Sequence, residues 1–342
     1  MTIEQIRKEV ASSKYDFIWT NEHLGRNIIL LTLGGSHAYG MDTEQSDLDI
    51  RGIALNSKDE ILLGKDFDQV VETNTDTIIY SMNKMIELLS KLNPNTIEIL
   101  GCKPEHYLIL SSIGEELLKN KKMFLSKICI HTFAGYAGAQ LRGLENKAAR
   151  LVGQAQNEEY ILKSIENAQY DFKNRYFPHE DNAIKLYIDE AVQKDFETEI
   201  FMDINLKHYP LRDYCGMWNE MKAIVGSYKK FGKRNENAVS HNKLGKHMAH
   251  LIRLYMMCID ILTKEEIITY RETEHNLLMS IRNGEFLDDN QQPVPEFYDI
   301  LNEYEKRFEY AKKNTSLPDV PDYKKINEFK MWVNEQIVKG LY

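Results

Sequence analysis

The chain has 342 residues, of which 43% are hydrophobic, so it can form one large domain or two ordinary domains around an apolar core. No apolar run approaches the roughly 18 residues that a membrane-spanning helix needs. The formal net charge of −9 argues against unspecific binding to nucleic acid, although the charge is uneven. Residues 229–253 carry seven Lys or Arg and one acid, whereas residues 285–309 carry eight acids and two bases.

The cysteines and the N-terminal residues indicate a cellular compartment. The cysteines show neither metal-ligand nor redox spacing; they are Cys102, Cys129, Cys215 and Cys258. Residues 3–13 alternate in charge and predict an amphipathic helix rather than a secretory signal. These features predict a reduced, cytoplasmic protein. Nothing in the sequence specifies an oligomeric state.

The first third of the chain is rich in predicted strands. Residues 27–33 (NIILLTL) predict a short buried strand, and residues 46–55 predict a second one. Residues 70–80 contain two further runs that favour β-structure. Ser81 is predicted to cap a helix with one apolar stripe, made of Met82, Met85, Ile86 and Leu89.

A break at residues 93–95 is expected to lead into another short helix, which begins at Asn95 or Thr96. Beyond residue 112 the β-favouring runs fade and long amphipathic stretches follow. They lie at residues 121–151, 158–170, 181–196, 211–229 and 243–262. The pattern predicts an α+β protein, with a sheet and flanking helices in residues 1–112 and a mostly helical domain in residues 113–342.

The turn after the first predicted strand suits a phosphate group. Gly34 and Gly35 let the backbone approach a phosphate because no Cβ stands in the way. Ser36 adds a hydroxyl group, and backbone amides at the end of a strand form an anion-binding nest. The turn therefore predicts a phosphate-binding site.

Asp47 and Asp49 lie two residues apart on the second predicted strand, so their side chains are expected to point to one face. Two carboxylates beside each other are costly unless a cation lies between them. Mg²⁺, or Mn²⁺ in its place, suits such a pair because it prefers oxygen ligands and substrate phosphates. The phosphate-binding turn and the two acids together predict nucleotidyl transfer that is assisted by metal ions.

This arrangement resembles the signature of the DNA polymerase β-like nucleotidyltransferase superfamily. More narrowly, residues 35–52 (GSHAYGMDTEQSDLDIRG) resemble RlaP-type nucleotidyltransferases of an RNA-repair pathway. NPNTIEIL at residues 93–100 and NKLGKHMAHLIRL at residues 242–254 extend the resemblance. It implies a polymerase-β-like sheet with flanking helices in a catalytic domain, residues 1–112, and a helical domain, residues 113–342, that closes the nucleotide cleft.

The resemblance also implies a third carboxylate, which binds a catalytic metal and helps to take the proton of the acceptor. Asp76 is the predicted residue, because a strand that starts there could run beside the Asp47 strand. Asp68 and Glu72 are the alternatives. Asp76 could instead be only a turn residue, since Asn and Asp are common in turns.

A basic helix face is the second predicted feature. Its members recur at steps of three and four residues; they are Lys243, Lys246, His247, His250 and Arg253. The apolar residues of the other side are expected to pack inward; they are Leu244, Met248, Leu251 and Tyr255. The resemblance implies that this face contacts the triphosphate or the acceptor backbone, although a plain solvated face is the alternative. An upstream cluster favours anion binding; it comprises Lys229, Lys230, Lys233 and Arg234.

Two more residues are predicted to contact the nucleotide. Arg51 follows the acids and could pair with them or with a phosphate. Tyr39 could stack on a base, although such aromatic residues also belong to cores.

The sequence thus predicts a transferase that moves a nucleoside monophosphate from a nucleoside triphosphate to a hydroxyl group and releases pyrophosphate. An RNA or tRNA end is the expected acceptor. A protein or small-molecule acceptor, a catalytically silent nucleotide-binding regulator and a pure nucleic-acid-binding protein are the alternatives.

Overall fold

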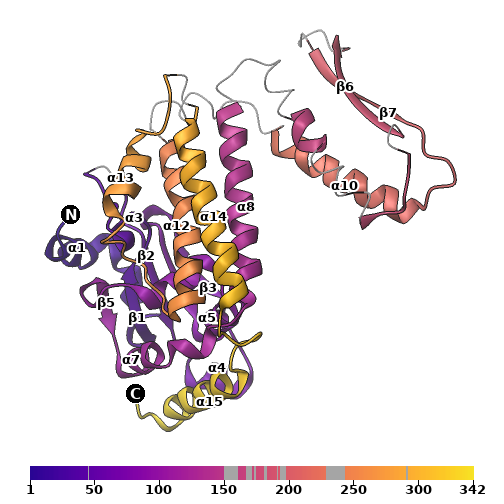
Figure 1. Cartoon of the computed structure of the whole chain (residues 1–342). Coiled ribbons are helices and arrows are strands. Elements are labelled where there is room, and N and C mark those ends of the chain that lie inside the picture. The colour runs from indigo at the N-terminus through magenta and orange to yellow at the C-terminus, as the bar shows by residue number, and fades with distance from the viewer. Residues whose placement is uncertain are drawn as a thin grey trace. The chain divides into compact units, whose positions relative to one another are not determined.

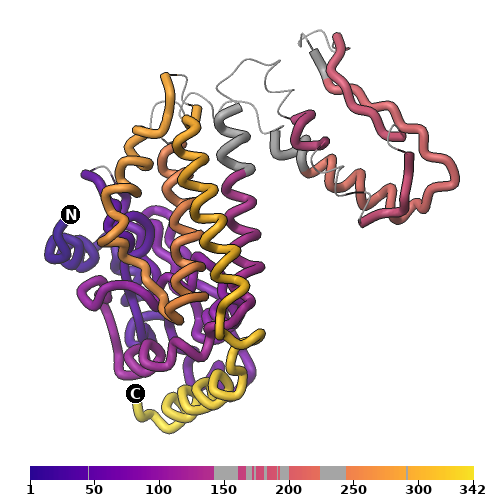
Figure 2. Tube along the Cα trace, viewed as in Figure 1, coloured from indigo at the N-terminus to yellow at the C-terminus, as the bar shows by residue number. Residues whose placement is uncertain are grey.

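The computed structural model describes residues 1–44, 46–149, 161–166, 172, 175–180, 183–190, 192, 198–228, 243–289 and 292–342. These residues form a mixed α+β fold, as predicted, and they divide into two compact units (Figures 1 and 2). Unit 1 comprises Met1–Ala139, Ala249–Ile281 and Glu296–Tyr342, and unit 2 comprises Gln140–Met248 and Arg282–Pro295. The chain passes between the units more than once, and the predicted boundary at residue 112 falls at the start of a helix inside unit 1.

A five-stranded sheet forms the centre of unit 1, with the order β3-β4-β2-β1-β5. Its strands are β1 (Ile28–Leu33), β2 (Ile50–Ala54), β3 (Gln69–Glu72), β4 (Thr77–Ser81) and β5 (Tyr107–Leu110). β1 is antiparallel to β2 and β5, and β3 is antiparallel to β4, whereas β2 and β4 are parallel. The parallel pair places the first residues of β2 and β4 at the same edge of the sheet.

The strand predictions hold for β1, whose residues are all buried, and the predicted run at residues 70–80 becomes the hairpin of β3 and β4. The second predicted strand is wrong at its start. β2 begins at Ile50 instead of Ser46, so Asp47 and Asp49 lie in the segment that leads into the strand. The reason is pairing, because β1 ends at Leu33, which is paired with Ile50.

Short helices connect and cover the strands of unit 1. They are α1 (Ile3–Val10), α2 (Phe17–Thr20), α3 (Gly35–Tyr39), α4 (Lys58–Leu63), α5 (Met82–Ser90), α6 (Pro94–Ile97) and α7 (Ser112–Lys119). Ser81 caps α5 as predicted, since its hydroxyl accepts the Lys84 amide, and the predicted apolar stripe is buried. The predicted start of α6 is wrong. Asn93 is the cap because its side chain accepts the Asn95 amide and Pro94 suits the first helical turn.

Longer helices follow: α8 (Ile128–Ala149), α12 (Lys243–Lys264), α13 (His275–Asn283), α14 (Pro295–Asn314) and α15 (Tyr323–Lys339). Inside unit 1, α12 lies beside both α8 and α14 (Figure 1). The Cys258 thiol reaches the Cys129 carbonyl oxygen, and the Tyr255 ring packs on Phe308. No helix within the described residues has the length and apolar character to cross a membrane.

Unit 2 contains a two-stranded sheet, β6 (Ile184–Glu190) and β7 (Thr198–Ile204), together with α10 (Leu211–Tyr228). The expectation of a helical stretch at residues 181–196 is wrong, because β6 lies there. Its sequence IKLYIDE alternates apolar and polar residues with the period of a strand. Ile184 on the apolar face of this strand joins a core cluster with Met217 and Met221 of α10.

Two glycines of unit 1 give opposite expectations for the same substitution. Gly114 packs so closely on β1 that a Cβ there would overlap the Ile29 carbonyl oxygen, whereas a Cβ at Gly135 in α8 meets open space. We expect Gly114→Ala to lower the free energy of unfolding by about 1–3 kcal/mol through overpacking. Gly135→Ala should raise it by up to about 1 kcal/mol, because alanine favours a helix interior. Urea unfolding of both variants checks this, and equal shifts would contradict the close approach.

Candidate active site

The predicted phosphate turn lies directly against one of the predicted metal ligands. The Gly34 amide donates a 2.8 Å hydrogen bond to the Asp49 carbonyl oxygen. Gly35 has a φ of +51°, and a Cβ there would overlap Oδ2 of the Asp49 carboxylate. The positive φ and the close approach both require glycine at position 35. The Gly-Gly pair therefore allows the Asp49 carboxylate to reach the turn. Ser36 follows, half-buried in the first turn of α3.

Asp76 lies beside Asp49 because of the parallel pairing of β2 and β4. Ile50 is paired with Thr77, so the residues that precede these two strands are neighbours. The Ile50 amide donates a 3.2 Å hydrogen bond to the Asp76 carbonyl oxygen. Asp76 is also a turn residue, with a φ of +43°. The two interpretations of Asp76 from the sequence are therefore compatible.

Asp49 has a raised pKa in this cluster. Burial, followed by a hydrogen bond with Asp76, raises the pKa of Asp49 to about 7. The negative charges of Asp76 and Asp47 act in the same direction, and Arg51 opposes them. Asp47 itself is exposed. Carboxylates gathered in this way favour a proton or a cation among them.

Arg51 is the cation that holds the acids in this structure. Its Nη2 lies 3.2 Å from Asp76 Oδ1 and 3.6 Å from Asp49 Oδ1. Its Nη1 donates to the carbonyl oxygens of Asp76 and Ile50. Arg51 was expected to pair with the acids or with a phosphate. In the structure it contacts two of the acids, Asp49 and Asp76.

The site fits a divalent cation by its chemistry. Carboxylates at one sheet edge are the oxygen ligands that Mg²⁺ and Mn²⁺ take, and the raised pKa of Asp49 shows that burial and the neighbouring acids disfavour its charged form. Across the described residues, however, no group of three or more His, Cys, Asp or Glu side chains is arranged so that it could hold a metal ion. Arg51 supplies the positive charge instead.

Tyr39 lies under a cation of the predicted basic face. Its ring is 2% exposed, and the Arg253 guanidinium lies 3.0 Å from the ring centroid. Arg253 also bonds His250 Nδ1 at 2.8 Å. Burial lowers the pKa of Arg253 to about 9, and the charge of Glu98 opposes this shift. Burial in turn raises the pKa of Glu98 to about 7.

The basic face of α12 is thus divided between the units. His250 and Arg253 belong to unit 1, together with the three acids, whereas Lys243, Lys246 and His247 belong to unit 2. Lys246 is exposed, and His247 Nδ1 lies 3.4 Å from Gln140 Oε1. The apolar side packs inward as predicted at Leu244, Met248 and Leu251, while Tyr255 is half-buried. The side chain of Lys243 and the cluster of Lys229, Lys230, Lys233 and Arg234 lie outside the described residues.

Tyr270 and Arg271 support the turn, and the sequence did not indicate them. The Arg271 amide donates to the Tyr39 carbonyl oxygen at 3.3 Å. The Tyr270 ring lies so close to Gly40 that a Cβ there would overlap it, and Gly40 has a φ of +70°. A glycine at position 40 is a local signal that another group approaches the backbone closely. No local pattern, however, identifies Tyr270 as that group, because it lies so far along the chain.

The sheet, the Gly-Gly turn and the clustered acids all lie within the segment that resembles polymerase-β-like proteins. The model of the RlaP family, described as the RNA repair pathway DNA polymerase beta family, matches residues 6–162. The match confirms the resemblance predicted from the sequence, and it indicates nucleotidyltransferase activity. Among curated proteins and among solved structures, nothing matched the chain.

Proposed function

We propose that the chain is a nucleotidyltransferase that depends on a divalent cation and moves a nucleoside monophosphate from a nucleoside triphosphate to a hydroxyl group. Pyrophosphate is the second product. The observation that carries the proposal is the convergence of Asp49 and Asp76 beside the Gly34-Gly35 turn. A phosphate site and a carboxylate cluster in contact are what this reaction requires.

Each group has a proposed role. Gly34, Gly35 and Ser36 bind the phosphates through backbone amides and the hydroxyl group. Asp47, Asp49 and Asp76 hold the cation, and Asp76 also accepts the proton of the acceptor hydroxyl. Bound Mg²⁺, or Mn²⁺, neutralises phosphate charge and makes the acceptor oxygen more nucleophilic.

The cations act on the nucleotide in this proposal. Arg51 contacts the acids in the structure, and it is close enough to the turn to exchange them for a phosphate, since the Arg51 side chain lies against Gly34. Arg253, held on Tyr39, and His250, to which it is bonded, are the members of the basic face that share a unit with the acids. The nucleotide-binding roles of Lys243, Lys246 and His247 remain predictions from the sequence.

An RNA or tRNA end is the proposed acceptor, and its support is the description of the matching family as an RNA repair pathway. The test incubates the full chain with each α-labelled triphosphate, Mg²⁺ or Mn²⁺, and either total RNA or a metabolite pool. We expect label from one triphosphate to enter RNA together with release of pyrophosphate. A chelator and an Asp47→Ala, Asp49→Ala double variant are the controls, and both should abolish transfer. If the label entered a metabolite or a protein instead, the proposed acceptor would be wrong, but the proposed transfer reaction would stand.

A second candidate is a nucleotide-binding regulator without turnover. The ion pairs of Arg51 favour it, because they supply to Asp49 and Asp76 the positive charge that a metal ion would otherwise bring. This candidate predicts tight triphosphate binding and no labelled product with any acceptor pool. That outcome of the same experiment would show that the chain binds a nucleotide at this site but does not catalyse transfer.

A further inference from the structure

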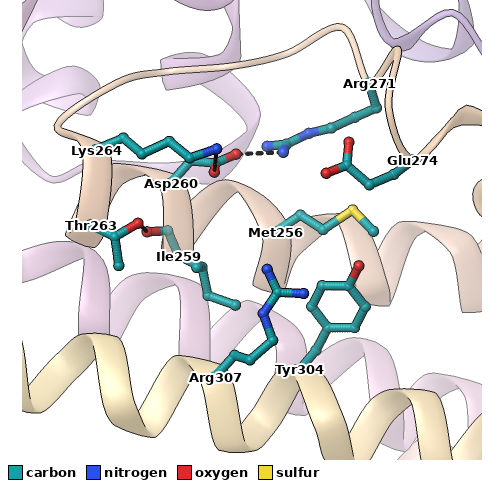
Figure 3. A pocket seen from close by; sticks show the side chains of 9 residues that line it. All are labelled: Met256, Ile259, Asp260, Thr263, Lys264, Arg271, Glu274, Tyr304 and Arg307. Atoms are coloured by element: carbon teal, nitrogen blue, oxygen red, sulfur yellow. Dashed lines mark hydrogen bonds and ion pairs between the residues drawn. The ribbon is translucent and has the colours of Figure 1, made fainter.

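A polar cavity lies within unit 1, among α12, α14 and residues 265–274 (Figure 3). Its volume is about 90 Å³. One of the residues that line it, Arg271, also supports the active-site turn through its backbone amide, whereas its guanidinium faces this cavity. The polar side chains around it include three cations and two acids; they are Lys264, Arg271, Arg307, Asp260 and Glu274.

Arg271 is the unusual member of this group. It is 3% exposed, and its Nη1 donates to Asp260 Oδ2. Its Nε and Nη2 are buried, and neither has a hydrogen-bond partner among the residues that the structure describes. These two nitrogens form one edge of the guanidinium, with parallel N–H groups that match two oxygens of an oxyanion. Unpaired buried donors are costly, so the edge favours a ligand that accepts from both.

The carboxylates around the cavity leave this edge unpaired. Asp260 Oδ2 binds Arg271, and Asp260 Oδ1 binds Lys264 at 2.8 Å, so both of its oxygens are engaged. Figure 3 draws the Glu274 carboxylate near the guanidinium, but in the described part of the chain Glu274 makes no ion pair within 4 Å. Counting Lys264, Arg271 and Arg307 against the two acids leaves one net positive charge.

We propose that this cavity binds a phosphate group, either as inorganic phosphate or as a small phosphate monoester. The Nε and Nη2 edge of Arg271 donates hydrogen bonds to two of its oxygens from the buried side. Arg307 and Lys264 are exposed and close the outer side with two further positive charges. The volume is sufficient, since one water needs only about 10–15 Å³ of such space. Three cations on different sides suit the three terminal oxygens of phosphate better than the two oxygens of a carboxylate.

The test measures phosphate binding to the full chain by calorimetry in a buffer free of other oxyanions and of divalent cations. Arg271→Lys keeps the positive charge near Asp260 but loses the Nε and Nη2 edge, and Arg307→Gln removes an exposed charge that also lies over the Tyr304 ring. We expect each variant to weaken binding about tenfold or more, as expected for loss of a charge-assisted hydrogen bond. Lys306→Gln is the matched control, since it removes one exposed charge from the same helix but does not line the cavity, and its Kd should stay within about twofold.

Two arms separate the sources of the phosphate. Inorganic phosphate is compared with glycerol phosphate, and glycerol is the uncharged match. If inorganic phosphate or glycerol phosphate binds, and both cavity variants weaken that binding, the site is supported. The phosphate that binds more tightly is then its ligand. Phosphate bound at the candidate active site would not respond to Arg307→Gln, since Arg307 has no contact with that site in the described residues. No binding at millimolar concentration, binding that neither variant weakens, or equal weakening by Lys306→Gln would overturn the proposal.

Discussion

Asp49→Asn is expected to reduce nucleotidyl transfer by about a thousandfold, because it removes a charged ligand that the divalent cation requires at the transferring phosphate. Asn keeps the size of the side chain and removes its charge. Asp49 is the acid that both the Gly34-Gly35 turn and Asp76 contact, so its loss affects the phosphate and cation sites together. Release of pyrophosphate in the presence of Mg²⁺ or Mn²⁺ measures the effect.

The same variant should be more stable than the wild type when no divalent cation is present. Its carboxylate is partly buried beside Asp76, with Asp47 nearby, and the amide does not repel these charges. We expect the free energy of unfolding to rise by about 1–2 kcal/mol, as is common when a charged functional residue is neutralised. Glu72→Gln, at the end of β3 and separated from β2 by β4, is the control that should change neither property. Full activity of Asp49→Asn, or a loss of stability without change in activity, would contradict the assignment.

Gly35→Ala is expected to lower activity about a hundredfold, because the new Cβ must displace the Asp49 carboxylate. A shift of about 1 Å at a catalytic group has effects of this size. Because φ is positive at residue 35, any residue with a Cβ there is also strained in the folded state. This strain lowers the free energy of unfolding by about 1–2 kcal/mol.

Gly64→Ala separates the two effects. Gly64 ends α4 with a φ of +64°, and a Cβ there meets nothing within 4 Å. It should therefore show the same stability loss of about 1–2 kcal/mol by thermal or urea unfolding and keep full activity. If Gly35→Ala transferred nucleotides as well as Gly64→Ala does, the close approach to Asp49 would have no catalytic role.

Much of the fold was predictable because its signals are local. The apolar run of β1, the Ser81 cap of α5 and the long periodic stretch of α12 each depend on residues close together in the chain. The β6 strand was missed because a short alternating segment among helical stretches resembles an amphipathic helix. The start of β2 was misplaced because strand ends depend on partners, and Leu33 decides where that pairing begins.

The sequence by itself determined the chemistry available at the site. Glycines with a hydroxyl after a strand, and acids two residues apart, are local features that indicate phosphate and cation binding whatever the rest of the chain does. Only the tertiary structure decided which groups meet. Asp76 joins Asp49 because β2 and β4 pair in parallel register, and Arg253 lies on Tyr39 because the chain returns to unit 1 as α12. Such contacts follow from strand register and helix packing, which depend on long-range burial and pairing rather than on neighbouring residues.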